Sequence, residues 1–207
     1  MKLSYAITVC NEVIEIQKLL GFLLQYKRPQ DEIVVLFDSK HGTNEVREIL
    51  KHYSKLDWYR WDEAEFDNHF ADWKNKLTNM CTGDYIFQID ADEIPCTPIL
   101  QSLPSILQNN PDVDVYLVPR VNTVEGMTQD HMQQWGWNVN AEGWINWPDY
   151  QWRIYRNDGT ITWKNRVHEV LQGFKKYAAL PMEEDYSLYH PKTIERQIKQ
   201  NEYYETL

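Results

Sequence analysis

The sequence predicts an α/β fold in which helices cover both faces of a mostly parallel sheet. In the first half of the chain, short apolar runs typical of buried strands alternate with segments whose apolar residues recur at helical spacing. Polar and acidic residues directly follow three of these runs. Because ligands of open α/β sheets bind beyond the carboxyl ends of the strands, the same alternation also predicts where a site should lie.

Four strands and three helices account for this first half. The run Leu3-Ser-Tyr-Ala-Ile-Thr-Val9 is apolar enough for a buried strand, and from Glu12 onward the apolar residues recur every three or four positions. The strand-then-helix pattern is then repeated, and the last helix leads into another apolar strand. We expect strands at residues 3–9, 32–37, 56–59 and 85–89, and helices at residues 12–24, 46–53 and 68–80.

The second half has a different character. Prolines at positions 95, 98, 104, 111 and 119 interrupt it, and its apolar runs are not separated by long helical patterns. We expect strands at residues 113–118, 151–155 and 160–163 in a mixed region of loops and antiparallel pairs, and a final helix over residues 193–204. Neither an internal repeat nor a linker rich in Gly, Ser or Pro divides the sequence, so one domain is expected.

Composition narrows the class of protein. The 207 residues carry a formal net charge of −10, which disfavours nucleic acids and anionic membranes as partners. The longest apolar runs fall far short of the ~20 residues that cross a bilayer, so no transmembrane segment is expected. Three cysteines without metal-ligand spacing, in a sequence without an evident signal peptide, indicate reduced thiols. We therefore expect a cytoplasmic protein.

The polar strand ends predict an acidic pocket. They are Thr8-Val-Cys-Asn-Glu12, Asp38-Ser-Lys-His-Gly-Thr43 and Asp90-Ala-Asp-Glu93. No Gly-rich phosphate loop follows any strand, so the charge of a phosphorylated ligand would need a divalent cation, Mg²⁺ or Mn²⁺, held by carboxylates. Asp90 and Asp92 suit this role because alternate residues at a strand end project to the same side. An Asp-x-Asp pair also occurs by chance on solvated loops; its place directly after an apolar strand favours the functional interpretation.

At these residues the sequence resembles the inverting nucleotide-sugar glycosyltransferases of family 2, which have the GT-A fold. Thr82-Gly-Asp-Tyr-Ile-Phe-Gln-Ile-Asp-Ala-Asp-Glu93 is similar to the family signature GDWILFLDADE, and Lys74-Asn75 stands where the family usually has Arg-Asn. Later stretches resemble the subgroup that includes lipopolysaccharide-core and peptide-modifying glucosyltransferases: Asp149-Tyr-Gln-Trp-Arg-Ile-Tyr-Arg156, Trp163, Arg166-Val-His-Glu169, His190 and Lys199-Gln-Asn-Glu-Tyr-Tyr204.

The resemblance implies a single GT-A domain over residues 1–207, with a Rossmann-like nucleotide-binding half at 1–93 and an acceptor-side half at 94–207. It implies metal-dependent transfer of a sugar, with inversion, from a nucleotide diphosphate donor, most simply a UDP-sugar, to a carbohydrate, lipid-linked or peptide acceptor. The residues that it assigns to the nucleotide are Thr8 and Cys10 beside the base, Asp38 at the uracil or ribose, Lys74, and Asp90 at the ribose or ion, with Glu12 at the same strand end. Asp92 would bind the ion that bridges the diphosphate.

An inverting transfer also needs a base near the acceptor hydroxyl. Asp149 resembles the family's catalytic Asp, although the Glu that usually precedes it is missing, and Glu169 in the Val-His-Glu motif is the rival. Both could instead be surface carboxylates. His168 and His190 could offer an imidazole to the ion or orient the diphosphate, or they could be structural.

Six of the nine tryptophans fall in one short stretch of the second half. Four of them could stack against a sugar and line the acceptor site, or they could build a core where regular structure is scarce: Trp135, Trp137, Trp144 and Trp147. Two other classes remain open. A sugar nucleotidyltransferase would need a Gly-rich basic loop after the first strand, whereas a carbohydrate-binding module would not need Asp90-Ala-Asp92.

Overall fold

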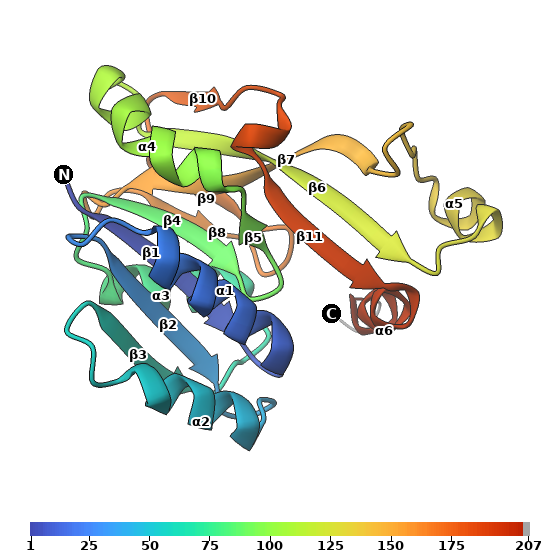
Figure 1. The fold of residues 1–207 in the computed structure, drawn as a ribbon, viewed down its shortest axis with the longest axis horizontal. Helices are drawn as coiled ribbons and strands as arrows, with labels where there is room; N and C mark the ends of the chain where they lie inside the picture. Colours follow the sequence, from blue (N-terminus) through green and yellow to red (C-terminus); the bar gives the residue numbers. More distant parts are fainter. Residues whose placement is uncertain (205–207) are drawn as a thin grey trace.

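The computed structural model describes residues 1–204, which fold around a nine-stranded mixed sheet (Figure 1). Its strand order is β3-β2-β1-β4-β7-β6-β11-β5, and β10 pairs with β6 beside this path. The strands are β1 Leu3–Val9, β2 Glu32–Asp38, β3 Tyr59–Ala64, β4 Tyr85–Asp90, β5 Ile94–Pro95, β6 Val115–Glu125, β7 Ile145–Arg156, β10 Tyr177–Ala179 and β11 Leu188–Thr193. A separate antiparallel pair consists of β8 Thr162–Lys164 and β9 Val170–Gln172.

The first half alternates strands and helices as predicted. Its helices are α1 Val13–Tyr26, α2 Asn44–Tyr53 and α3 Phe70–Met80. β1 pairs in parallel with β2 and β4, and β2 pairs in parallel with β3, so the four strands end at the same edge. The helices of the second half are α4 Thr97–Asn109, α5 Gln129–Trp135, the short 3₁₀ helix η1 Glu184–Tyr186 and α6 Ile194–Tyr204. The final helix was expected at this place.

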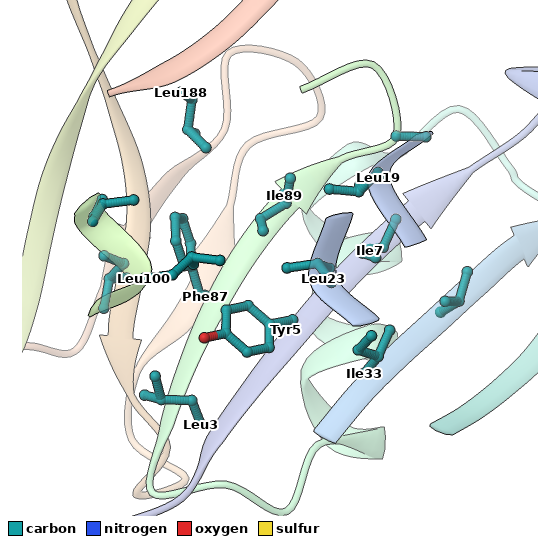
Figure 2. Close-up of a cluster of buried hydrophobic side chains, with 14 of the residues drawn as sticks. Leu3, Tyr5, Ile7, Leu19, Leu23, Ile33, Phe87, Ile89, Leu100 and Leu188 are labelled. Atoms are coloured by element: carbon teal, nitrogen blue, oxygen red, sulfur yellow. The ribbon is translucent and has the colours of Figure 1, made fainter. Parts of the chain in front are cut away.

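Two apolar cores hold the layers together, one on each face of the sheet. The first joins β1, β2 and β4 to α1, α2 and α4, and Figure 2 shows it around Tyr5 and Phe87. The second joins the other face of the same strands to α3 and to the β8–β9 pair. Ile86 and Phe87, adjacent on β4, belong to different cores and are both fully buried. Because the strands are covered on both faces, they are continuously apolar rather than alternating.

The structure corrects three expectations. The third strand lies at Tyr59–Ala64 rather than at residues 56–59, because it is an edge strand with mostly polar, solvent-facing side chains. A long helix, α4, occupies part of the proline-rich stretch. Pro98 lies in its first turn, which tolerates proline, and Pro104 lies inside it; burial of Ile99 and Leu103 supports the helix despite Pro104. The strand β11 was not predicted, and it pairs with β6 in parallel.

Within the described residues, every helix is too short or too polar to cross a bilayer.

Candidate functional site

A cavity of about 850 Å³ lies at the carboxyl ends of β1, β2 and β4, as the sequence predicts. The first half of the chain lines one side of it, including Thr8, Cys10, Glu12, Asp38, Asp90 and Asp92. The second half lines the opposite side with residues of β6, β7, β11 and α6. Thus the three polar strand ends do converge on one pocket.

The ends of β1 and β2 are held by carboxylates. Asp38 is almost fully buried, and its Oδ1 accepts the backbone N–H groups of Lys40 and Phe66, which fixes the loops after β2 and β3. Glu12 accepts the backbone N–H of Cys10 at 2.8 Å. Burial, followed by the nearby charges of Glu12 and Asp38, raises the pKa of the Cys10 thiol to about 12. Cys10 is therefore a neutral lining group and not a nucleophile.

A buried arginine from β7 faces the end of β4. Arg153 is 3% exposed and donates to Asp90 at 2.7 Å and to Glu93 at 2.6 Å. Arg120 of β6 also contacts Glu93, at 3.1 Å. Burial by itself would raise the pKa of Asp90, but the Arg153 charge outweighs it and the pKa falls to about 2. Asp90 is therefore ionised at neutral pH and held in place, with Thr8 Oγ1 3.3 Å from its other oxygen.

Asp92 meets His190 on the far side of the cavity. The amide nitrogen of Asn122 donates to Asp149 at 2.8 Å, so its oxygen faces His190 Nδ1, which must donate the 2.8 Å hydrogen bond between them. His190 Nε2 is then directed at Asp92 Oδ2, 3.2 Å away. Burial alone would raise the pKa of Asp92, but the His190 charge and hydrogen bond hold it far below its ordinary value.

One carboxylate and one imidazole at this point could hold a divalent cation. His190 Nε2 and Asp92 Oδ2 lie 3.2 Å apart, close enough for both to bind one metal ion. Among residues 1–203 no three His, Cys, Asp or Glu side chains are grouped as a complete metal site. Magnesium-type ions commonly use only one or two protein ligands and complete their shell with water and substrate phosphates, so Asp92 and His190 fit that mode. Asp90 is instead engaged by Arg153.

The two candidate bases lie in different surroundings: Glu169 lines the cavity, whereas Asp149 is not among the described residues that line it and lies beside Gln151, which does. Asp149 on β7 accepts from Arg120 at 2.6 Å and from Gln151 at 2.7 Å, besides Asn122. Burial would raise its pKa, but the Arg120 charge and these hydrogen bonds lower it. Glu169 lines the cavity and is ion-paired with Lys74, which is almost fully buried. The ammonium group of Lys74 also lies 4.7 Å from the centre of the Trp163 ring.

The structure separates the two histidines that were predicted together. His190 joins Asp92, whereas His168 is exposed, has a left-handed backbone (φ 53°) and lines the cavity beside Glu169. In the described part of the chain, no hydrogen bond or ion pair connects His168 with Asp90 or Asp92.

The four tryptophans assigned to an acceptor lie outside the cavity lining. Three of them belong to the connection between β6 and β7, which projects from the body of the molecule with α5 at its tip, and Trp147 lies at the start of β7 (Figure 1). The rings of Trp135 and Trp137 are tilted against each other with centres 4.7 Å apart, and Trp144 meets Trp147 edge to face at 4.8 Å. Their acceptor role stays a prediction.

Apart from Lys74, sequence reasoning missed the basic side chains of the site. Arg120, Arg153, Lys192 and Arg196 all line the cavity, and none was assigned a role. Arg196 on α6 contacts Glu12 at 3.3 Å and Asp92 at 3.4 Å. One signal was present in the sequence: Arg153 stands inside an apolar strand pattern, where a charge needs a partner.

Comparison with known families decides the classification. The model of glycosyl transferase family 2 matches residues 4–179, most of the chain. The chain belongs to glycosyl transferase family 2. A comparison with curated proteins finds no significant match.

Solved structures similar to this family 2 chain include S. aureus TarS 1-349, with 16% identity and a TM-score of 0.62 over 92% of this chain and 60% of that one. The complex of TarS 1-349 with UDP-GlcNAc gives 18% identity and a TM-score of 0.64, over 93% of this chain and 59% of that one. The complex of TarS 1-349 with UDP gives 16% identity and a TM-score of 0.59, over 89% of this chain and 62% of that one. The chain thus spans less than two thirds of these TarS chains, and the likeness confirms the GT-A fold predicted from the sequence.

Proposed function

We propose that this chain transfers a sugar from a UDP-sugar to an acceptor hydroxyl, with inversion and with the help of a divalent cation. The observation that carries the proposal is the convergence of Asp90, Asp92 and His190 on one cavity at the strand ends of a family 2 fold. The uridine donor is supported by the TarS structures, which bind UDP-GlcNAc and UDP. A volume of about 850 Å³ is sufficient for a ligand of that size.

Asp92 and His190 would hold the ion. When bound, Mn²⁺ or Mg²⁺ would neutralise the negative charge that develops on the departing diphosphate. The chain itself supplies fixed positive charge on the same side of the cavity, where Lys192 and Arg196 lie. These cations are placed to attract the diphosphate and to hold the leaving group after the glycosidic bond breaks.

Asp149 is the proposed base. Inversion requires the acceptor oxygen to attack the anomeric carbon from the side opposite the diphosphate, while a carboxylate takes its proton. Asp149 is ionised because of Arg120, and Gln151, which donates to it, lines the cavity. Glu169 lines the cavity itself, and Lys74 pairs with it as Arg120 pairs with Asp149. Asp149 is preferred because it stands where the family has its catalytic Asp. The Arg120 contact orients Asp149 and lowers its basicity, so proton transfer must occur late, when the attacking oxygen has become acidic.

The direct test measures UDP-sugar hydrolysis and transfer with Mn²⁺, with Mg²⁺ and in excess EDTA. Activity should need the ion, and Asp92→Asn should abolish it without changing the unfolding temperature by more than a few degrees. UDP should raise the unfolding temperature more than ADP, since only a ligand of the folded state stabilises it. Full activity in EDTA would refute metal dependence, and equal shifts would refute the uridine preference.

The base is tested by a matched pair of variants. Asp149→Asn should lower turnover by roughly 10²–10⁴-fold, while the thermal shift by UDP is unchanged. Glu169→Gln is the control and should have a much smaller effect on turnover. A larger loss in Glu169→Gln, with UDP binding intact, would move the base to the Val-His-Glu motif.

A further inference from the structure

The connection between β6 and β7 is far longer than the fold requires. The two strands are antiparallel partners, with Asn122 opposite Ile145, and such a pair is usually joined by two to five residues. Here residues 126–144 intervene and form a projecting arm that contains α5 (Figure 1). We call residues 126–148 the aromatic arm. Connections of this length that are ordered are commonly functional.

The aromatic arm has a defined structure held by local hydrogen bonds. Thr128 caps α5 in a reciprocal capping box with His131, and Gly136 ends the helix in the left-handed conformation. Asn140 and Asn146 then accept backbone N–H groups of Trp144 and Asn138, which shapes the return to β7. No residue of α5 is buried. The order of the arm therefore does not come from packing α5 into the body of the protein.

The side chains of the arm have a distinct chemistry. Its four tryptophans are each half-buried. Among the described residues, none of the four indole N–H groups donates a hydrogen bond within the chain. Six amide side chains lie among them: Gln129, Gln133, Gln134, Asn138, Asn140 and Asn146. No Lys or Arg occurs between Arg120 and Arg153, although the arm contains Asp130 and Glu142.

This combination fits one class of ligand. Flat indole faces with free N–H groups suit the apolar faces and hydroxyls of sugar rings, and amides both donate to and accept from hydroxyls. A phosphate-rich or otherwise anionic polymer would find no cation on the arm and would be repelled by its two carboxylates. The ligand that matches is therefore a neutral saccharide.

The strands that carry the arm also line the cavity. Gln151 and Trp152 on β7 line the cavity, and Trp147 lies four residues before Gln151 on the same strand, at most about 13 Å away at about 3.3 Å per residue because an irregularity in β7 shortens the path. A sugar chain whose end lies at Gln151 would thus reach the arm with its more distant units. We propose that the aromatic arm is a binding site for a neutral oligosaccharide, and, given the proposed function, that it holds the units of the acceptor distant from the reacting hydroxyl.

The test uses isothermal titration calorimetry on the whole chain with cellohexaose, chitohexaose and maltohexaose, and with hexagalacturonate as an anionic probe of equal length. At least one neutral hexasaccharide should bind, and hexagalacturonate should bind at least tenfold more weakly. Trp135→Ala and Trp144→Ala should each weaken binding at least tenfold. Trp58→Ala is the matched control, since Trp58 is also half-buried and lies under Lys27, in the loop before the edge strand β3 and away from β6 and β7 in the sheet.

Thermal unfolding of each variant checks the fold. If Trp144→Ala unfolds, Trp135→Ala on α5 decides the question, because α5 buries no residue. The proposal is overturned if none of the three neutral hexasaccharides binds, if the arm variants bind as well as Trp58→Ala, or if hexagalacturonate binds best. It is also overturned if sedimentation shows that the arm instead joins two copies of the chain and that Trp135→Ala abolishes this dimer.

The two proposals fail separately. A chain that hydrolyses no UDP-sugar but binds a neutral hexasaccharide through the arm would contradict the proposed function and leave the arm as a saccharide site. A chain that hydrolyses UDP-sugar but binds none of the hexasaccharides would refute the arm site alone. Asp92→Asn separates them in one protein, since it should lose transfer and keep arm binding.

Discussion

Replacing Arg153 by Met should destabilise the protein strongly, because it would leave a buried charge without its main partner. Glu93 is fully buried and Arg153 is 3% exposed, and they lie 2.6 Å apart. Asp90 is less dependent on the arginine, since its side chain is 32% exposed and water can solvate it. The cost therefore comes chiefly from Glu93.

Removing one member of a buried ion pair typically costs about 3–5 kcal/mol. Arg120 still contacts Glu93, at 3.1 Å, so we expect a loss near the lower limit, about 3 kcal/mol. For a chain of this size that corresponds to a fall in unfolding temperature of roughly 6–12 °C. Adding Glu93→Gln to Arg153→Met removes the unpaired charge and should restore much of the loss.

Urea unfolding at pH 7, followed by tryptophan fluorescence and circular dichroism, measures the free energy of unfolding of each variant. Arg47→Met is the control: Arg47 pairs with Glu63 at 2.7 Å, but both are partly exposed, so less than about 1 kcal/mol should be lost. A loss below 1 kcal/mol in Arg153→Met, or a double variant no more stable than the single one, would refute the reasoning.

Three further outcomes follow from single positions. Hydrogen bonds from Lys2, Ser4 and Thr82 outweigh burial and lower the pKa of Glu32 to about 2. Roughly 3 kcal/mol of stability that is present above pH 4.5 should therefore be lost as the pH falls towards 2. Glu32→Gln should flatten this dependence when the free energy of unfolding is measured across acid pH. Gly83→Ala would place a Cβ 2.7 Å from the Ser4 backbone nitrogen and should cost about 1–3 kcal/mol in urea unfolding. Gly21→Ala, exposed in α1 with no atom within 4 Å of the added Cβ, should stabilise by about 0.5–1 kcal/mol, seen as a higher unfolding temperature.

The part of the site formed by the first half of the chain was predictable, because the local sequence pattern identifies the strands whose ends form it. Each buried strand there is a continuous apolar run, and in a parallel sheet the ends of such runs meet at one edge. Asp38 and Asp90 stand directly at those ends, so their approach to one cavity followed from the strand assignment alone. The helix α4 was missed for the opposite reason, because Pro104 is a strong local signal that tertiary packing overrides.

The second half of the site depends on pairings that are remote in sequence. Arg153 meets Glu93 across 60 positions, and His190 meets Asp92 across 98. Neither pairing leaves a local pattern, since each is set by which strand lies next to which. The parallel pairing of β11 with β6, which brings His190 opposite Asn122, has no hairpin or crossover signature in the sequence.

Packing nevertheless determines where Arg153 points. β7 pairs with β4 so that Ile154 lies opposite Phe87, and both belong to the core under α1 and α4. Successive strand residues point to opposite faces, so Arg153 and Tyr155 must face the other side, where α3 lies and where Asp90 ends its strand. A slip of one residue would bury Arg153 among the apolar side chains of the first core and turn Ile154 towards Asp90. The high cost of that arrangement fixes the register, and the register in turn places Arg153 against the carboxylates of the cavity.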